Sequence, residues 1–320
     1  MTASPLHTLP RERLLALVEA FEFKPYRHYR TFTRKQQAAV LAAEVDQALA
    51  GAPFGEWTTR DGDEAGVVAR RLPWDSTFFG VPMGRIEYVL ASAGATVEHI
   101  ESAIAGTMRA AKAAGLRHLA ARVDVADLRT MSVLEAAGFR TMDALVTYIM
   151  RPGKDAHPDV RPVGTIRDGT PADTEAIVAI TADAYRGYRG RFHLDSHLSS
   201  ERADALYLEW ARACASRTMA DTVIVAEDAN GEVSGYLAYR RREPVSGIAS
   251  PVFGGGLGAV RRDSPGAYTG LIQEGSRRAH AAGAVSECQT QNYNFAVIRV
   301  YEAAGFHYVR AEYTLHAWLA

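Results

Sequence analysis

Two side chains near the C-terminal end of the chain could do chemistry from one face of a helix. Asn294 is a typical N-cap residue, and Tyr301 follows seven positions later, two helical turns along the same face. A phenol in that place could act as a general acid and give its proton to a leaving group. The alternative is that Tyr301 is a packed aromatic side chain, so the spacing alone leaves both interpretations open.

A glycine-containing turn over residues 261–266 comes just before a second predicted helix. It follows a strand that ends at Ala259 and Val260, and Gly266 stands directly before the helix. Free backbone N–H groups and the positive end of the helix dipole suit a pyrophosphate at such a place. A plain strand-to-helix connection would have the same composition, so this interpretation also stays open.

A basic and aromatic cluster lies in the middle of the chain. Its members are Tyr185, Arg186, Tyr188, Arg189, Arg191 and His193. Guanidinium groups bind phosphate oxygens in pairs of hydrogen bonds, and a phenol ring can stack on a base, so the cluster predicts an anionic acceptor site. A solvated arginine loop is the alternative. His193, Asp195 and His197 lack further ligands at zinc spacing, so no metal is expected.

Composition excludes several classes of function. The chain has 320 residues, 48% of them hydrophobic and 23% charged, which is typical of two globular domains. A formal net charge of −1 gives no general attraction to nucleic acid or to an anionic membrane. Cys214 and Cys288 are too few for a disulfide framework. With charged residues interrupting the N-terminal apolar run, no signal peptide is expected, and we predict a cytoplasmic protein.

One module occurs twice in the chain. Residues 135–139 and 302–306 are both Glu-Ala-Ala-Gly-Phe, and each follows an Ala-Ala-Gly, at 113–115 and 281–283. From the first glycine to the second is 23 positions in one copy and 22 in the other. The place of Tyr301 is taken by Leu134 in the first copy. The second copy is therefore predicted to carry the chemistry, and the first to be structural.

Strands alternating with helices predict an α/β fold in each copy. The first copy has predicted strands at 66–72, 83–90, 119–125 and 141–150 and helices at 97–111 and 128–137. The second has a helix that starts after Thr170, hairpin strands at 223–226 and 233–239, a strand to 260, helices at 267–281 and 295–304, and strands at 285–290 and 308–315.

Four segments follow from this pattern. Residues 1–52 are predicted to be a helical extension, whose last helix has a capping box of Thr33 and Gln36 and ends before Gly51. Residues 53–152 form the first domain, the proline-containing residues 153–165 form a linker, and residues 166–320 form the catalytic domain.

The second copy resembles the Gcn5-related N-acetyltransferase (GNAT) superfamily. The resemblance covers residues 165–320 in order. It rests on Ile166-Arg167-Asp168 with Asp173, Gly235-Tyr236-Leu237, Ala259-Val260 before the Gly266 turn, and Asn294 through Tyr301 to Gly305-Phe306. It implies tandem GNAT-like modules, each a mixed, mainly antiparallel sheet flanked by helices, the first of them degenerate. It also implies acetyl-CoA as the co-substrate.

A second resemblance is to the dTDP-fucosamine (dTDP-4-amino-4,6-dideoxygalactose) acetyltransferases. It rests on Leu72-Pro73-Trp74-Asp75 with Phe78-Phe79-Gly80-Val81, on Arg191-Phe192 followed by Tyr207 and Trp210, and on Thr290-Gln291 with Asn294. This resemblance implies a nucleotide-linked amino sugar as the acceptor.

The resemblances imply roles for particular residues. Tyr301 would be the general acid, Asn294 would contact the pantetheine arm, and the backbone of residues 258–260 would hold the thioester carbonyl. The full cofactor-binding set is Ala259, Val260, Ser264, Gly266, Ala267, Tyr268, Asn294 and Tyr301. The acceptor-binding set is Tyr185, Arg191, His193 and Gln291.

We therefore predict direct acetyl transfer from acetyl-CoA to a small primary amine in a ternary complex. One alternative keeps the fold and changes the acceptor to an antibiotic, an amino acid derivative or a carrier-bound amine. Another is a non-catalytic acyl-CoA-binding protein, which Asp263 and Tyr268 favour because the superfamily usually has other residue types there. Residues 250–260 contain no carboxylate, so the sequence does not identify a general base. A homodimer is possible, and the sequence does not determine the oligomeric state.

Overall fold

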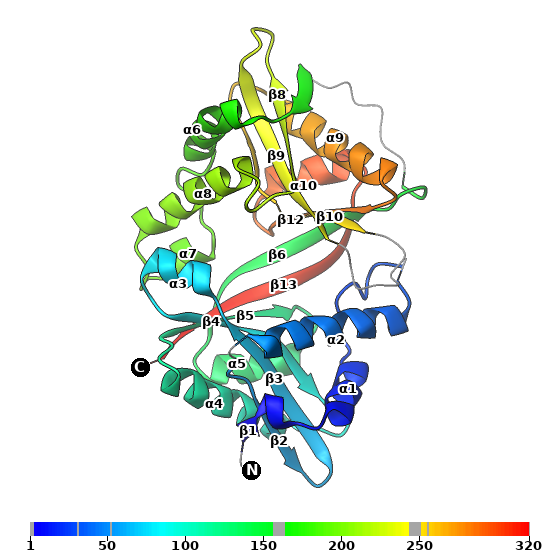
Figure 1. Cartoon of the computed structure of the whole chain (residues 1–320), viewed down its shortest axis with the longest axis vertical. Helices are drawn as coiled ribbons and strands as arrows, with labels where there is room; N and C mark the ends of the chain where they lie inside the picture. Colours follow the sequence, from blue (N-terminus) through cyan, green and yellow to red (C-terminus); the bar gives the residue numbers. More distant parts are fainter. Residues whose placement is uncertain are drawn as a thin grey trace. The chain divides into compact units, whose positions relative to one another are not determined.

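A computed structural model describes residues 3–30, 32–51, 53–155, 164–242, 251–254 and 256–319. The chain divides into two compact units, unit 1 (Met1–Ala144 and Ala311–Ala320) and unit 2 (Leu145–Arg310) (Figure 1). Most of the predicted linker, residues 156–163, lies outside the described residues. Among the described helices, none combines the length and the hydrophobicity that a membrane span requires.

Unit 1 has a mixed sheet with helices on both faces. Its elements in chain order are β1 (Ser4–Pro5), η1 (Leu6–Thr8), α1 (Arg11–Ala20), α2 (Arg34–Ala50), β2 (Glu56–Arg60), β3 (Asp63–Arg71), α3 (Pro73–Phe79), β4 (Met83–Ala91), α4 (Val97–Ala113), β5 (His118–Asp124) and α5 (Leu128–Ala136). Neighbouring strands run β1-β2-β3-β4-β5-β13. Within this set β4 and β5 pair in parallel, whereas β1–β2, β2–β3, β3–β4 and β5–β13 are antiparallel pairs.

Unit 2 repeats this order. Its elements are β7 (Thr165–Asp168), η2 (Pro171–Asp173), α6 (Thr174–Ala184), α7 (Arg191–Leu194), α8 (Ser200–Ala215), β8 (Thr222–Glu227), β9 (Val233–Arg242), β10 (Val252–Gly254), β11 (Gly258–Val260), α9 (Ala267–Ala281), β12 (Val285–Gln291) and α10 (Phe295–Ala303). Its strands run β6-β12-β10-β9-β8-β7, with β11 also paired to β9. The strand and two helices of the predicted N-terminal extension thus stand where β7, α6 and α8 stand in unit 2.

Two strands belong partly to each unit. β6 (Arg140–Met150) starts in unit 1, and its residues Leu145 to Met150 pair with β12 in unit 2. β13 (His307–Trp318) starts in unit 2, and its residues Glu312 to Trp318 pair with β5 in unit 1. Each copy therefore supplies the strand that completes the sheet of the other unit.

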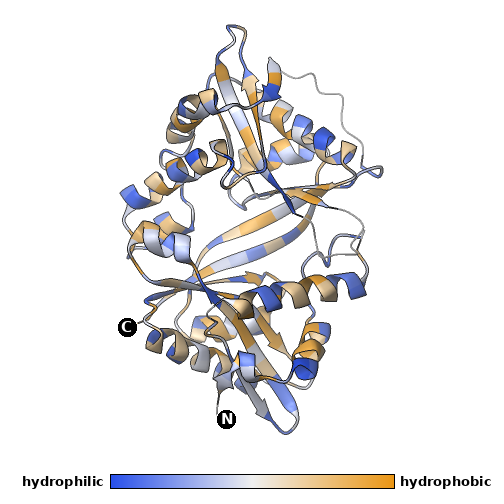
Figure 2. Cartoon of the chain, viewed as in Figure 1, coloured by the Kyte–Doolittle hydropathy of each residue, from blue (hydrophilic) through white to orange (hydrophobic). Residues whose placement is uncertain are grey.

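Alternating side chains of the strands bury the two faces of each sheet. In unit 1, Val67 packs in the cluster formed by α4 and α5, and the next residue, Val68, packs with α1 and α2. In unit 2, Ile224 packs against α9, whereas the hydroxyl of Tyr236 lies 2.8 Å from that of Thr181 in α6. Figure 2 shows that the helices carry both hydrophobic and hydrophilic residues, as expected for helices with one buried face.

The repeated motifs have the same backbone structure in both units. The helices α5 and α10 are followed by Gly138 (φ +92°) and Gly305 (φ +89°), a left-handed conformation that favours glycine. The N–H of Phe139 donates to the carbonyl of Leu134 over 3.0 Å, and the N–H of Phe306 donates to that of Tyr301 over 2.9 Å. Leu134 and Tyr301 are therefore structurally equivalent positions.

The predicted capping box of Thr33 and Gln36 is present at α2. A second helix start differs from its prediction, because Thr170 precedes the short turn η2 and α6 begins only at Thr174. The reason is the carboxylate of Asp173, which accepts from the N–H of Thr170 over 2.7 Å and ends the first turn.

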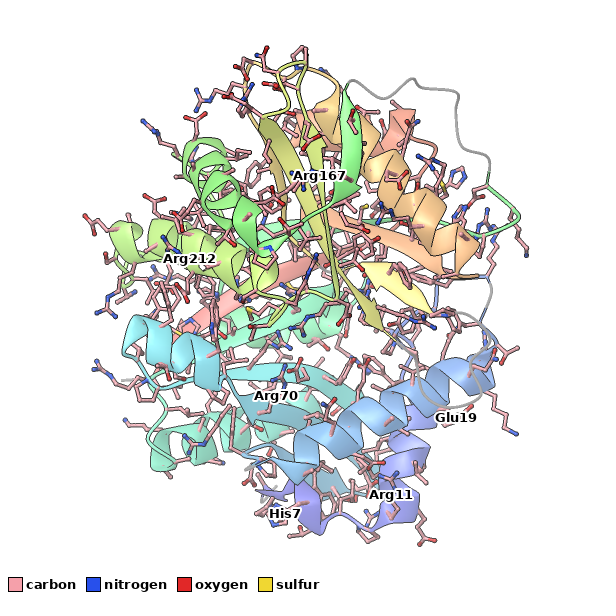
Figure 3. All side chains as sticks on the ribbon, turned by 45° about the horizontal axis from the view of Figure 1, so that its top comes forward. His7, Arg11, Glu19, Arg70, Arg167 and Arg212 are labelled. Atoms are coloured by element: carbon pink, nitrogen blue, oxygen red, sulfur yellow. The ribbon has the colours of Figure 1, made fainter. Side chains whose placement is uncertain are left out.

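Arg167 of β7 joins three elements of unit 2 (Figure 3). Its guanidinium donates to both carboxylate oxygens of Asp173, over 2.8 and 2.9 Å, and to Glu227 of β8 over 2.6 Å. These bonds hold the pKa of the Asp173 carboxyl well below its ordinary value. The contact fixes β7 and the start of α6 onto the sheet.

Candidate functional site

In unit 2 the sheet opens between β11 and β12. β10 pairs with β9 on one side and with β12 on the other, at Val252 with Val285 and Phe253 with Ser286. β11 then pairs with β9, and no pairing of β11 with β12 occurs among the described residues. Backbone N–H and C=O groups along residues 258–260 are therefore available to a ligand that pairs as a strand would.

Gly256 makes this opening possible. Any Cβ there would lie 1.5 Å from the carbonyl oxygen of Ala238, so no other residue fits. The register passes from Gly254 opposite Arg240 to Gly258 opposite Leu237, so four steps on one strand face three on β9. This is a β-bulge.

The helix α9 starts beside this opening without a side-chain cap. Its N-cap is Gly266 (φ +84°), and the first turn contains no acidic residue. Asp263 nearby accepts from Arg261 Nε over 3.0 Å and from the hydroxyl of Ser264 over 3.2 Å, so an arginine offsets its charge. The first N–H groups of α9 thus form a place where an anion can be held.

The equivalent helix in unit 1, α4, has a closed N-terminus. Thr96 and His99 form a reciprocal capping box, and Glu98 adds a carboxylate in the first turn. A Cβ on Gly94 would lie 2.4 Å from the carboxylate of Asp63, which also accepts from the hydroxyl of Ser92 over 2.8 Å. Side-chain oxygens and a negative charge stand where a phosphate would bind, so this turn is unsuited to an anion.

Tyr301 of α10 contacts β12, one of the two strands beside the opening in unit 2. Its side chain is buried, and its hydroxyl donates to the carbonyl of Gln289 over 3.3 Å. Burial raises the pKa of the Tyr301 phenol well above its ordinary value, and the neighbouring Tyr268 raises it further. At ordinary pKa values, proton transfer from a tyrosine to a thiolate is uphill by about 2 kcal/mol, and here the transfer is more costly.

Tyr268 joins the start of α9 to the opening. A Cβ on Gly258 of β11 would lie 3.2 Å from Cε2 of its ring. Tyr268 and Tyr301 share a hydrogen bond between their hydroxyls. Burial raises the pKa of Tyr185 and of Tyr236, and the nearby Tyr268 phenol raises both pKa values further, so Tyr268 lies within electrostatic range of each.

The side chain of Asn294 is directed away from its own helix. Asn294 occupies the N-cap position of α10, yet its Nδ2 donates to the hydroxyl of Thr290 over 2.9 Å, and it makes no capping bond. In unit 1 the equivalent Asp127 caps α5 by accepting from the N–H of Thr130 over 3.1 Å. The first turn of α10 is therefore open, whereas that of α5 is closed.

The predicted acceptor residues lie around a group of aromatic rings in unit 2. Tyr185 stacks on Tyr207 of α8 with ring centroids 4.4 Å apart, and His193 stacks on the same tyrosine at 5.9 Å. Tyr188 contacts all three rings. Its hydroxyl donates to the side chain of Gln291 at the end of β12. The structure thus brings Tyr185, His193 and Gln291 into one cluster.

Arg191 has its guanidinium 4.4 Å from the centroid of the Phe192 ring. Arg186, in contrast, has an exposed side chain 3.8 Å from a carboxylate oxygen of Asp183. The arginines predicted as one basic patch therefore have separate surroundings, and Arg191 belongs to the same short helix, α7, as His193.

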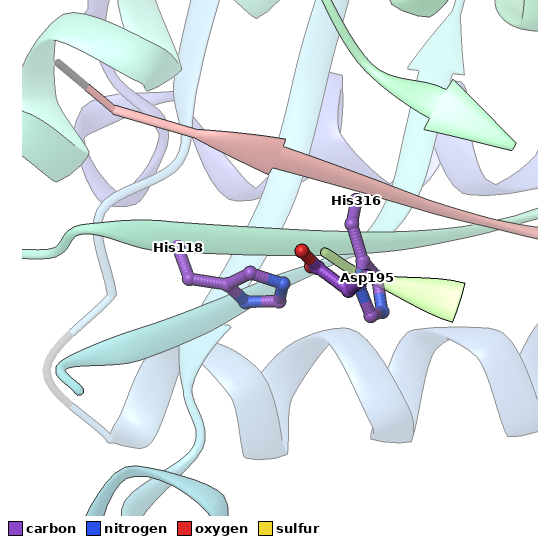
Figure 4. A group of neighbouring side chains, drawn as sticks. All are labelled: His118, Asp195 and His316. Atoms are coloured by element: carbon purple, nitrogen blue, oxygen red, sulfur yellow. The ribbon is translucent and has the colours of Figure 1, made fainter. Parts of the chain in front are cut away.

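Two buried histidines in unit 1 were not predicted as a feature. His118 of β5 and His316 of β13 have ring centroids 4.5 Å apart and lie nearly perpendicular (Figure 4). Asp195, also drawn there, belongs to unit 2, where its carboxylate accepts from the backbone N–H of His197 over 3.1 Å. His193 and His197 of the predicted cluster contact different carboxylates, those of Asp204 and Asp195.

Comparison with solved structures gives the fold. A tandem GNAT protein from the clavulanic acid biosynthesis pathway matches 99% of this chain and 98% of its own, with a TM-score of 0.53 at 16% identity. The chain has a tandem GNAT fold. A GCN5-related N-acetyltransferase from Sphaerobacter thermophilus also matches, over 87% of this chain and 85% of its own, with a TM-score of 0.53 at 14% identity.

A third structure matches over only part of its own length. It is described as a GCN5-related glucosamine N-acetyltransferase region in a fungal multi-domain β-N-acetylglucosaminidase, and it has a TM-score of 0.58 at 11% identity. It covers 96% of this chain and 36% of the fungal one. At such identities the likeness establishes the fold alone.

Among curated proteins, the spore coat polysaccharide biosynthesis protein SpsD of Bacillus subtilis (strain 168) is 29% identical over 152 residues. The match covers 46% of this chain and 48% of that protein, so it spans about half the length of the relative. No protein-family model matches the chain.

Proposed function

We propose that the protein is an N-acetyltransferase that transfers the acetyl group of acetyl-CoA to a primary amine, with the chemistry in unit 2. The observation that carries this proposal is the difference between the two copies of one fold. Unit 2 has an open sheet edge at β11 and an uncapped α9, whereas α4 of unit 1 is capped by its own side chains. The candidate acid Tyr301 also belongs to unit 2, and the equivalent position in unit 1 is occupied by Leu134, which has no proton to donate.

The residues of unit 2 fit acetyl-CoA. The turn of Ser264, Gly266 and Ala267 would hold the pyrophosphate on free N–H groups, and the backbone of Ala259 and Val260 would pair with the pantetheine arm. Asn294 would hydrogen-bond the same arm through its side chain. When the amine attacks the thioester carbonyl, a β11 N–H would stabilise the developing oxyanion, and Tyr301 would protonate the thiolate.

For the acceptor we propose an anionic amine, specifically a nucleotide-linked amino sugar. The ring cluster of Tyr185, Tyr188 and Tyr207 offers faces for a base or sugar, and Arg191 offers a guanidinium for a phosphate. The relationship to a polysaccharide biosynthesis protein supports this acceptor class. We further propose that the protein acts in the cytoplasm, where such substrates are made.

The test is acetyl transfer to a panel of amines. The purified chain is incubated with acetyl-CoA and either nucleotide-linked amino sugars, free amino sugars, aminoglycosides or amino acids. CoA release and the mass of the N-acetyl product are both measured. We expect transfer to a nucleotide-linked amino sugar with the highest kcat/KM. Binding of acetyl-CoA without CoA release on any amine would favour a non-catalytic acyl-CoA-binding protein instead.

A further inference from the structure

The imidazole of His193 has a hydrogen-bond partner at one nitrogen only. Its Nε2 lies 3.0 Å from Oδ1 of Asp204 in α8. The side chain is only 10% exposed, and its Nδ1 is buried without a hydrogen-bond partner among the described residues. A buried polar atom without a partner destabilises the folded protein, so its presence calls for a reason.

We infer that His193 is the general base for the acceptor amine, and that Asp204 positions it. This inference rests on the proposed acetyl transfer. A carboxylate that accepts from Nε2–H places the imidazole proton on that nitrogen and leaves a lone pair on Nδ1. An aspartate holds the imidazole in the required tautomer by the same logic in hydrolytic triads. The atom left free for chemistry is then the buried one.

A continuous set of aromatic rings connects His193 with the opening in the sheet. Its ring centroid is 5.9 Å from that of Tyr207, which in turn is 4.4 Å from that of Tyr185. Tyr185 is in electrostatic range of Tyr268, whose ring adjoins Gly258 of β11. An acceptor bound along these rings would have its amine between His193 and the opening in the sheet.

On the β10–β11 side of the opening, residues 250–260 contain no Asp, Glu or His. On the β12 side, the carboxylate of Glu287 is buried and forms an ion pair with Arg242. In the proposed step, the amine N–H bond breaks and its proton passes to Nδ1 of His193. The nitrogen lone pair forms the bond to the acetyl carbon, the C–S bond of the thioester breaks, and the thiolate takes the hydroxyl proton of Tyr301. After the product leaves, His193 gives its added proton to water and Tyr301 takes a proton from water, so both side chains return to their starting protonation states.

The variant that separates proton transfer from binding is His193→Asn. Its amide oxygen can accept a hydrogen bond near the place of Nδ1 but cannot take a proton. We expect kcat to fall by about 10²- to 10⁴-fold, with the acceptor KM within about twofold of the wild-type value. Asp204→Asn should give a smaller fall in kcat with the same unchanged KM. Acetyl-CoA affinity, measured by calorimetry, should not change in either variant.

The matched control is His307→Asn. His307 also faces a carboxylate, with its Nε2 3.3 Å from Oδ1 of Asp155, but its side chain is 60% exposed and lies outside the ring cluster. Its kcat should equal that of the wild type. A second variant, His193→Ala, leaves a space in which added imidazole should restore a measurable part of kcat.

Three results would overturn the inference. One is a folded His193→Asn protein with kcat within twofold of the wild-type value. Another is an equal rise of the acceptor and acetyl-CoA KM values, which indicates disturbed folding. The third is a His193→Ala protein that binds acetyl-CoA normally yet gains nothing from imidazole. If the unaltered protein transfers acetyl to no amine, the proposed function itself fails, which is a separate outcome.

Discussion

Replacing Tyr301 by phenylalanine tests whether its hydroxyl is an acid or only part of the core. The ring stays, so its packing 5.7 Å from Tyr148 and 6.0 Å from Phe306 is kept. Two hydrogen bonds disappear, a long one of 3.3 Å to the carbonyl of Gln289 and the one shared with the hydroxyl of Tyr268, so the free energy of unfolding should fall by about 1–3 kcal/mol. Loss of a general acid should lower kcat by 10²- to 10⁴-fold, about 3 to 5 kcal/mol in activation free energy.

The assay measures single-turnover CoA release, acetyl-CoA affinity and thermal unfolding on the same samples. Tyr148→Phe is the matched control, because the ring of Tyr148 packs against that of Tyr301. This variant removes a hydroxyl that donates to the carboxylate of Glu302 over 3.2 Å. The control should lose a similar amount of stability and keep its kcat. A folded Tyr301→Phe protein with wild-type kcat, with the chemical step shown to be rate-limiting, would refute the role of Tyr301 as the acid.

Three further predictions concern other parts of unit 2. Gly266→Glu should abolish acetyl-CoA binding in calorimetry, because a carboxylate would stand at the N-terminus of α9 and a non-glycine residue would need φ +84°; unchanged affinity would contradict the anion site. Arg191→Ala should raise the acceptor KM about tenfold and leave the acetyl-CoA KM unchanged, since one charge-assisted contact is lost; equal changes would speak against an acceptor role. Asp173→Asn should lower the free energy of unfolding at pH 7 by about 2 kcal/mol. Because Arg167 lowers the folded-state pKa of this carboxyl, its contribution exists above pH 4, and the difference from wild type should shrink in denaturant titrations as the pH falls below that value.

Local signals in the sequence predicted the local structure well. The capping box at Thr33, the hairpin around Asp228 to Gly231, and the bounds of α9 are each set by residues within a few positions of one another. The carboxylate of Asp228 accepts from the N–H of Asn230 over 2.9 Å, which is the turn chemistry that this composition indicates.

Features that depend on distant residues could not be predicted. Nothing near β6 or β13 in the sequence indicates that each strand completes the sheet of the other copy. The contact of His193 with Asp204 joins residues eleven positions apart across α7 and α8, and α8 itself has no strong start signal besides Ser199. The capped N-terminus of α4 could not be predicted from the sequence, because its capping box has His99 where Glu or Gln is usual.

The structural role of the N-terminal helices could be assigned only from the sheet topology. α1 and α2 pack on Val68 and Leu90 of the sheet of unit 1, and β1 pairs with β2 as β7 pairs with β8. The loop between these helices places Arg27 3.0 Å from Asp124, at the end of β5. The equivalent end of β12, Gln291, is bonded by Tyr188.

Isothermal calorimetry with acetyl-CoA distinguishes a chain in which only unit 2 binds the co-substrate from one in which both copies of the fold bind it. We expect one equivalent per chain, lost in Gly266→Glu. We expect unchanged binding in Ala93→Glu, which puts the same charge on an exposed residue of the corresponding turn in unit 1. Two equivalents per chain, or one equivalent that Ala93→Glu removes and Gly266→Glu leaves intact, would show that unit 1 binds the co-substrate.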